Sequence, residues 1–151
     1  LLSVRIPKIE LIVFGQLSPA KPPDLGVPVH YTGHLHDDIS LRMLYSAADA
    51  LVVPSKLEAF GQTASEAHSC ATPVIAFKTS GLLDIVDHEV TGYLANAFEP
   101  ADLAKGIEWV MKDRKRLEKL GGNARQKAEE NFSYLVVGEL YNEVYEYCIR
   151  E

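Results

Sequence analysis

The sequence predicts an α/β domain in which a parallel sheet is flanked by helices on both faces. Short apolar segments alternate with segments of helical periodicity along the 151 residues, and no internal repeat or low-complexity segment interrupts them. Such an alternation is typical of parallel strands joined by helical crossovers. A hydrophobic content of 47% is enough for one good core, and the length fits a single domain.

Each expected strand is a short apolar run that ends at a turn-forming residue. The expected strands are Ile9 to Phe14, Val29 to Tyr31, Asp49 to Val53, Val74 to Phe77 and Gly92 to Leu94. The expected helices are Asp38 to Ala47, Gln62 to Cys70, Gly81 to Val86, Ala101 to Lys112, Arg114 to Glu130 and Tyr134 to Arg150. Around Trp109, the residues Leu103, Ile107, Val110 and Met111 recur at amphipathic spacing, so they are assigned to the core.

The turn that follows Val53 carries the pattern that points to a ligand. P-S-K-L-E-A-F-G-Q-T-A-S-E-A, from Pro54 to Ala67, places Glu58 and Glu66 eight positions apart around the start of a helix. A helix N-terminus offers unpaired N–H groups and a positive dipole end, so an anion can bind there without a basic side chain. Gly61 lets the backbone come close. Two acceptor-only carboxylates beside an anion site suit the hydroxyls on either side of a diphosphate.

Charge and cysteine usage exclude several classes of partner. The formal charge of −6 argues against nucleic acid or an anionic membrane as the main partner. Cys70 and Cys148 lack the spacing of a disulfide framework or metal site. His34 and His36 have no third ligand at suitable spacing, so no metal is expected. No apolar run reaches the roughly 18 residues of a transmembrane segment, and no signal peptide is visible. A cytoplasmic location is expected, and the alternative is that the full-length protein attaches peripherally to a membrane.

The run from Tyr45 through Val86, continued by T-G-Y-L at Thr91 to Leu94, resembles a known domain. It is similar to the C-terminal donor-binding domain of family-4 retaining glycosyltransferases, which have a GT-B fold and an E-x7-E motif. The resemblance covers nearly the whole chain. It implies a Rossmann-like parallel sheet forming one half of a GT-B fold, and transfer of a sugar from a nucleotide-sugar to an acceptor hydroxyl with retention. The substrate would be a nucleoside diphosphate sugar, and neither a cofactor nor a metal would be needed.

The same resemblance assigns roles to the residues of the turn. Glu58 would meet the hydroxyls of the donor sugar and is the catalytic candidate, and Glu66 would bind the ribose hydroxyls. The sugar and diphosphate would be held by amides of the F-G-x-x stretch, which is Phe60, Gly61, Gln62 and Thr63.

Two further loops are implied in donor binding. G-H-L at Gly33 to Leu35 corresponds to the family's base-contacting loop, where the main chain at Leu35 would read the base edge. S-G-L-L-D, from Ser80 to Asp84, matches a G-G-x-x-[ED] loop, which brings Gly81 beside the donor and puts serine in place of the first glycine. Ligands of open parallel sheets bind beyond the carboxyl ends of the strands, so the loops after Tyr31, Val53 and Phe77 are expected to share one crevice.

The basic half of the diphosphate clamp is expected to be absent. G-Q-L-S-P-A-K, from Gly15 to Lys21, looks like the family's G-R-L-x-x-x-K segment, yet only eleven residues separate Lys21 from Gly33 and Gln16 replaces the arginine. The opening L-L-S-V-R-I-P is expected to be the end of a helix that leads into the first strand. We therefore expect residues 1–151 to be a single C-terminal nucleotide-sugar-binding domain. The first strand-helix unit and the N-terminal acceptor domain would be missing, so the fragment would be inactive alone.

Other functions remain open at this point. A glycoside hydrolase also uses two carboxylates, but it needs them across one bond, and these two straddle a helix start. A nucleotide-sugar 2-epimerase of GT-B fold and a non-catalytic sugar-nucleotide-binding module are the stronger alternatives. The two glutamates could also have no role in binding. Glu66 would then be a solvated helix carboxylate, and Glu58 a first-turn residue favoured by the helix dipole.

The last expected helix carries more apolar and aromatic residues than one packing stripe needs. They are Tyr134, Leu135, Val136, Val137, Leu140, Tyr141, Val144, Tyr145 and Tyr147. We expect them to leave an exposed apolar patch that is buried by self-association, or the helix end to fray.

Overall fold

A computed structural model describes Ile6 and residues 8–150, and its helices and strands follow the predicted order. The segment L-L-S-V-R-I-P lies, apart from Ile6, outside the described residues. The strands are β1 (Leu11–Phe14), β2 (Val29–Gly33), β3 (Leu51–Val53), β4 (Val74–Phe77) and β5 (Gly92–Ala95). The helices are α2 (Asp38–Ala47), α3 (Gln62–Ser69), α4 (Leu82–Ile85), α5 (Pro100–Met111), α6 (Arg114–Phe132) and α7 (Tyr134–Arg150).

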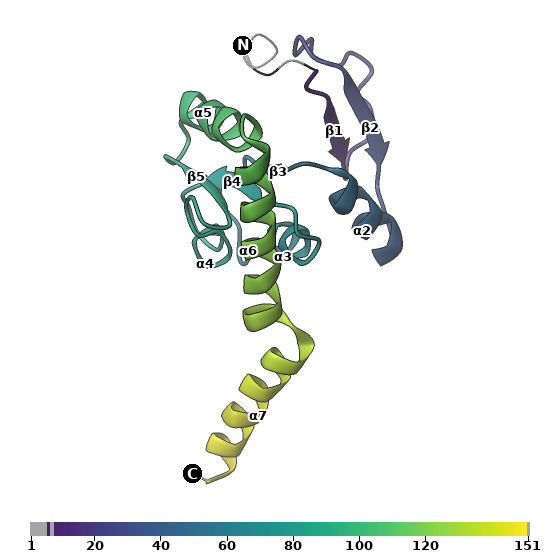
Figure 1. The fold of residues 1–151 in the computed structure, drawn as a ribbon. Helices are drawn as coiled ribbons and strands as arrows, with labels where there is room; N and C mark the ends of the chain where they lie inside the picture. The colour runs from purple at the N-terminus through teal and green to yellow at the C-terminus, as the bar shows by residue number, and fades with distance from the viewer. Residues whose placement is uncertain (1–5, 7, 151) are drawn as a thin grey trace.

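The strands are all parallel, but they form two sheets rather than the single sheet that the sequence predicts. β1 pairs with β2 in one sheet, and the other has the order β3-β4-β5. β3 has three residues and pairs with β4, so a second ladder along it would add few hydrogen bonds. β1, β2 and α2 consequently form a unit beside the three-stranded sheet (Figure 1). The predicted class, parallel strands flanked by helices, is confirmed.

The three-stranded sheet is covered on both faces. Every residue of β4 is buried, and alternate side chains enter different clusters: Val74 and Ala76 pack with residues of α3 and α4, whereas Ile75 packs with residues of α5 and α6. Helix α6 lies along this body (Figure 1) and presents a stripe of buried residues to it. These are Leu117, Leu120, Gly121, Ala124 and Ala128. An unbroken apolar strand between two helical layers is the arrangement expected of a buried parallel sheet.

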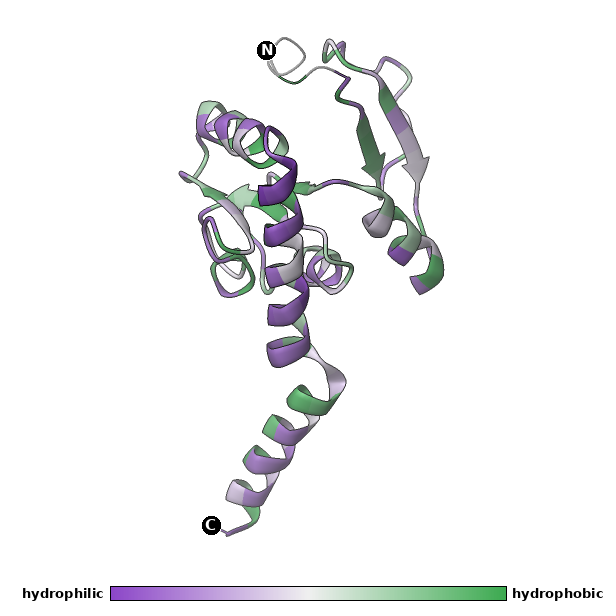
Figure 2. Cartoon of the chain, in the orientation of Figure 1, coloured by the Kyte–Doolittle hydropathy of each residue, from purple (hydrophilic) through white to green (hydrophobic). Residues whose placement is uncertain are grey.

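Helix α7 extends away from the body (Figure 1) and has no buried residue. Tyr134 is 99% exposed and Leu135 is 82% exposed. Hydrophobic and hydrophilic residues alternate along it (Figure 2), so apolar side chains face water over its length. Seven of the nine residues predicted to form the apolar patch are exposed, whereas Val136 and Val137 are half-buried. None of the helices in the described part of the chain is both long and apolar enough to cross a membrane.

Candidate functional site: the N-terminus of helix α3

Gly61 starts helix α3, and its position needs a glycine. Its φ of 97° and ψ of 50° lie in the left-handed region, and a Cβ there would come within 3.1 Å of the Leu82 side chain. The Gly61 carbonyl accepts the N–H groups of Ala64 at 2.9 Å and Ser65 at 3.1 Å. The helix therefore begins directly after the turn, as the sequence predicts.

The first amides of α3 have no protein partner. Within the described part of the chain, the N–H groups of Gly61, Gln62 and Thr63 donate to no acceptor. Gln62 and Thr63 are exposed, and no acidic side chain occupies the first turn of the helix. Unpaired N–H groups at the positive end of a helix dipole form a site for an anion.

Glu58 is held by its main chain, which leaves its carboxylate available to a ligand. Its N–H donates to Ser80 Oγ at 2.9 Å, and its carbonyl accepts the Gly81 N–H at 3.0 Å. Thr79 Oγ1 donates to the Lys56 carbonyl at 3.4 Å, so the loops after β3 and β4 are joined at several points. The half-buried Glu58 carboxylate has no hydrogen-bond or ion-pair partner among the described residues.

Gly81 packs against the backbone that leads into α3. A Cβ at this position would lie 2.6 Å from the Phe60 carbonyl oxygen and 2.7 Å from that of Ala59. Because the Gly81 amide is bonded to Glu58, Gly81 positions the Glu58 loop rather than offering a free donor. The preceding residue, Ser80, has a φ of 44°, so serine occupies a left-handed position where the resembled loop has glycine. Phe60 is partly exposed, and its ring meets Phe132 edge-on at 5.5 Å.

Glu66 lies one turn into α3, and its carboxylate is already engaged on one oxygen. The Tyr45 hydroxyl, from α2, donates to Glu66 Oε2 at 2.9 Å. Burial and the Glu66 carboxylate raise the pKa of Tyr45, so the hydroxyl stays protonated and remains a donor at neutral pH. Sequence reasoning did not single out Tyr45. The available signal was that a tyrosine within a predicted helix, if buried, needs a partner for its hydroxyl.

The predicted base loop lies on the β1–β2 unit. Gly33 ends β2 with a φ of 71°, and its carbonyl accepts the Gly15 N–H at 2.8 Å. Leu35 is half-buried, and in the sequence it lies between Gly33 and Asp37, the N-cap of α2. The structure thus joins two of the three predicted loops directly, those after β3 and β4. The third is linked to Glu66 through α2 and Tyr45. In the segment from Gly15 to Lys21, which only looks like the family's basic segment, Gln16 and Lys21 are exposed. Gln16 forms an isolated antiparallel β-bridge with Gly33.

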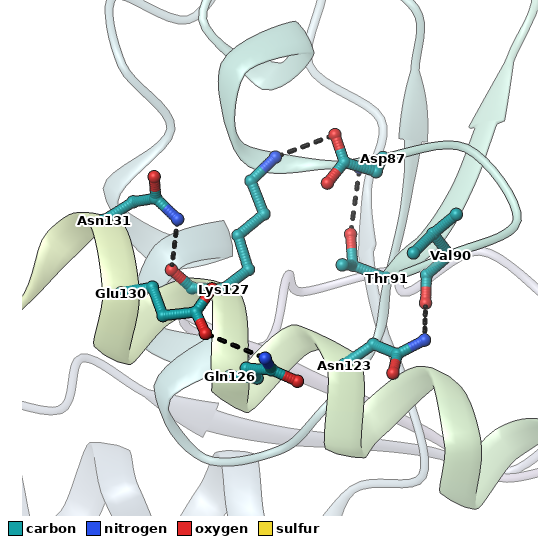
Figure 3. Close-up of a pocket in the computed structure, with 8 residues that line it drawn as sticks. All are labelled: Asp87, Val90, Thr91, Asn123, Gln126, Lys127, Glu130 and Asn131. Carbon is teal, nitrogen blue, oxygen red and sulfur yellow. Dashed lines mark hydrogen bonds and ion pairs between the residues drawn. The ribbon is translucent and has the colours of Figure 1, made fainter.

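Two surface hollows lie away from the predicted site. The larger, of about 430 Å³, is formed by α6 and the loop before β5 (Figure 3), and its lining side chains largely pair with one another. Lys127 meets Asp87 at 2.8 Å and Asn123 donates to the Val90 carbonyl at 2.9 Å. The other, of about 330 Å³, lies between α2, the end of α3 and α6. Neither hollow includes a residue predicted to bind a donor. In the described residues no group of three or more metal-ligating side chains comes together.

The site therefore combines a helix start whose first N–H groups are unpaired with a carboxylate on each side of it, at the edge of a buried parallel sheet. Residues 4–127 match the family described as "Glycosyl transferases group 1", which is well over half of the chain. The chain belongs to the group 1 glycosyltransferases.

Relatives of this group 1 glycosyltransferase domain agree in sequence and in fold. The D-inositol 3-phosphate glycosyltransferase of Corynebacterium kroppenstedtii is 34% identical over 111 residues, which is 74% of this chain and 24% of that protein. Sucrose-phosphate synthase from Thermosynechococcus elongatus superposes with a TM-score of 0.75 at 31% identity, over 96% of this chain and 41% of that one. Anabaena HepE in complex with UDP-glucose superposes with a TM-score of 0.73 at 27% identity, over 81% of this chain and 34% of that one. The chain thus spans about a quarter of the curated relative and about a third to two fifths of the two solved structures.

Proposed function

We propose that this domain is the donor-binding part of a retaining, family-4 hexosyltransferase, and that it binds a nucleoside diphosphate sugar at the start of α3. The observation that carries the proposal is the set of unpaired amides at Gly61, Gln62 and Thr63, with Glu58 before them and Glu66 after them. Membership in the group 1 family supports it, as does the fold shared with HepE, which was solved with UDP-glucose.

In this proposal, the diphosphate lies against the first amides of α3. Charge builds on the departing phosphate as the bond to the anomeric carbon breaks, so amides already aimed at it stabilise the transition state. Glu58 accepts hydrogen bonds from the sugar hydroxyls and fixes the orientation of the sugar. Ser80 and Gly81 hold the Glu58 loop in place through its amide and carbonyl.

At the other end of the donor, Glu66 accepts hydrogen bonds from the ribose hydroxyls and the main chain at Leu35 contacts the base. The acceptor hydroxyl enters on the face from which the nucleoside diphosphate leaves, through an oxocarbenium-like transition state. No covalent intermediate on Glu58 is invoked. No metal or other cofactor takes part, and nucleic acid is not a partner.

Several properties of the whole protein belong to the same proposal. The acceptor is held by the protein's own N-terminal domain, so residues 1–151 bind the donor but transfer no sugar. The full-length protein works in the cytoplasm, in solution or at a membrane surface. Two of the relatives named above are a glycosyltransferase and a synthase, which gives no support to a 2-epimerase or to a non-catalytic module.

Calorimetric titration of this chain with UDP, UDP-glucose and the corresponding GDP and ADP compounds tests the site. Glu66→Ala is expected to weaken binding of the nucleoside diphosphate itself, whereas Glu58→Ala removes mainly the contribution of the sugar. Loss of a hydrogen bond to a charged carboxylate costs about 1.5–3 kcal/mol.

The exposed Glu139 of α7 supplies the matched control, because Glu139→Ala changes the same charge far along the chain from α3. If both site variants bind every ligand as the parent and the control do, the assignment is wrong. Sugar transfer by the purified 151-residue chain would contradict the inactivity of the fragment.

A further inference from the structure

Tyr45 lies where the two sheets meet, and it is held on several sides. It is 2% exposed, and the Phe14 ring of β1 meets its ring edge-on with centroids 5.7 Å apart. Thr72, just before β4, donates its hydroxyl to the Tyr45 carbonyl at 2.7 Å. The ring and the main chain are therefore fixed by the surrounding core, and the hydroxyl points at the Glu66 carboxylate, 2.9 Å away.

Tyr45 is the group that orients this carboxylate. The neighbouring polar side chains of α3 turn to the helix backbone: Ser65 Oγ donates to the Gln62 carbonyl and Ser69 Oγ to the Ser65 carbonyl. Among the described residues, the Tyr45 hydroxyl is the one recorded hydrogen-bond donor to the Glu66 side chain. Without it, a half-buried glutamate with three rotatable bonds would have no fixed orientation.

The bond orients Glu66 without saturating it. An ionised carboxylate has about four lone-pair sites, and the Tyr45 hydroxyl takes one of them, on Oε2. The free sites suffice for two vicinal hydroxyls. A carboxylate held in this way is ready to accept the 2′ and 3′ hydroxyls of a ribose.

The same bond connects Glu66 to the helix that follows the predicted base loop. Helix α2 starts at Asp38, three residues after Leu35 at the end of the predicted base loop, and its start is fixed by Asp37, which accepts the Ser40 N–H at 2.8 Å. Tyr45 lies in the last turns of this helix. The helix therefore spaces the loop from the Glu66 carboxylate, as a rigid base and ribose require.

We propose that Tyr45 is a positioning residue for Glu66, and that this bond sets the preference of the site for ribose over deoxyribose nucleotides. The inference rests on the proposed function, in which Glu66 receives the ribose hydroxyls. Tyr45 itself does not touch the ligand. Its hydroxyl orders the Glu66 side chain before the ligand binds. For a side chain with many rotamers, that ordering corresponds to roughly a two- to tenfold change in affinity.

The test compares UDP with 2′,3′-dideoxy-UDP, titrated into the parent chain and into Tyr45→Phe. The parent is expected to prefer UDP. In Tyr45→Phe the affinity for UDP falls about two- to tenfold, while the affinity for the dideoxy compound stays the same, so the ratio between the two shrinks. Equal losses for both ligands, or an unchanged ratio, overturn the positioning role.

Two variants separate this role from a structural one. Tyr93→Phe removes a similar bond, from a tyrosine hydroxyl to Asp102 at 3.4 Å, on the other side of the core. It is expected to lower stability and leave the ligand ratio unchanged. In the Glu66→Ala background, which has no side-chain acceptor for the Tyr45 hydroxyl, Tyr45→Phe is expected to have no further effect on UDP affinity, and an undiminished effect there contradicts the inference.

The outcomes also distinguish the two proposals. A parent chain that binds UDP and its dideoxy analogue equally well, or binds neither, shows that Glu66 does not receive ribose hydroxyls and overturns the proposed function. A parent that prefers UDP, with a Tyr45→Phe variant that keeps the full preference, leaves the proposed function intact and overturns the role of Tyr45 alone.

Discussion

Ser80 Oγ accepts the Glu58 N–H at 2.9 Å, so a side chain in the loop after β4 fixes the backbone of the catalytic candidate in the loop after β3. Ser80 does this from a φ of 44°, where a side chain is strained. The serine therefore adopts a strained backbone conformation in which its side chain can accept this hydrogen bond. Since the Gly81 N–H bonds the Glu58 carbonyl at 3.0 Å, Glu58 is held through both of its main-chain polar groups.

Ser80→Ala is expected to destabilise the chain by about 1–2 kcal/mol, because it loses the hydrogen bond and keeps the strained φ. Ser80→Gly loses the same bond but relieves a left-handed strain of about 1 kcal/mol, so its stability should stay near that of the parent. Urea unfolding at neutral pH measures both. An alanine variant as stable as the glycine variant would show that the φ does not matter at this position, and an alanine variant as stable as the parent would show that the bond does not.

Gly61→Ala is expected to lower stability by about 1–2 kcal/mol, because the start of α3 is left-handed and the added methyl would press on Leu82. Binding of UDP should weaken as well, since the amides at the helix start would shift. Gly122→Ala is the matched control. At this position in α6 an added Cβ would meet no heavy atom within 4 Å apart from its own stretch of helix, so this change should raise stability by up to about 1 kcal/mol. Equal effects at the two glycines would contradict the assigned cap.

Local patterns account for most of the fold. The predicted bounds of α2, α7 and β4 coincide with the observed ones, because each is delimited by a strong signal such as the N-cap Asp37 or the buried run of β4. The separation into two sheets was not predicted, because strand pairing is a long-range property that apolar periodicity does not encode. The turn from Glu58 to Glu66 was located for the same local reasons.

The contacts between loops needed the structure. No sequence signal indicated that Ser80 and Gly81 would hold the backbone of Glu58, or that Tyr45 would bond Glu66 across 21 positions of the chain. Such partners depend on how the helices and sheets pack. They are also the contacts that turn a common pair of glutamates into an ordered site.

His68 is expected to make the chain sensitive to acid. It is fully buried in α3, and both ring nitrogens lack a hydrogen-bond partner within the described part of the chain. Burial, aided by the charge of Lys127, lowers the pKa of His68 from 6.5 to about 4. Its stabilising contribution is therefore complete above pH 6.5 and is lost as the pH falls from there through about 4, since the unfolded chain takes up the proton first. The total loss is about 3 kcal/mol.

Replacing this histidine removes the titration. His68→Leu is expected to flatten the pH dependence of the unfolding free energy between neutral pH and pH 4, and to keep or raise stability at neutral pH because two unsatisfied polar atoms disappear. His34→Gln, at an exposed histidine, should leave the profile unchanged. Urea unfolding of the three chains at a series of pH values measures this. A leucine variant with the parent's acid slope would mean that other groups cause the loss.

The apolar face of α7 is expected to drive self-association of this chain. Tyr141 and Val144 are 60% and 57% exposed on one side of a helix that has no buried residue. An exposed apolar surface of this kind is normally covered by a partner, and a second copy supplies one when nothing else is present. Tyr141→Glu is expected to convert the associated parent into a monomer in analytical ultracentrifugation, with the melting temperature of the body unchanged. Asn142→Glu adds the same charge at the next residue, on a different side of the helix, and should leave the association intact. A parent that is monomeric at every concentration, or an Asn142 variant that dissociates as readily as the Tyr141 variant, would rule out a dimer formed through this face.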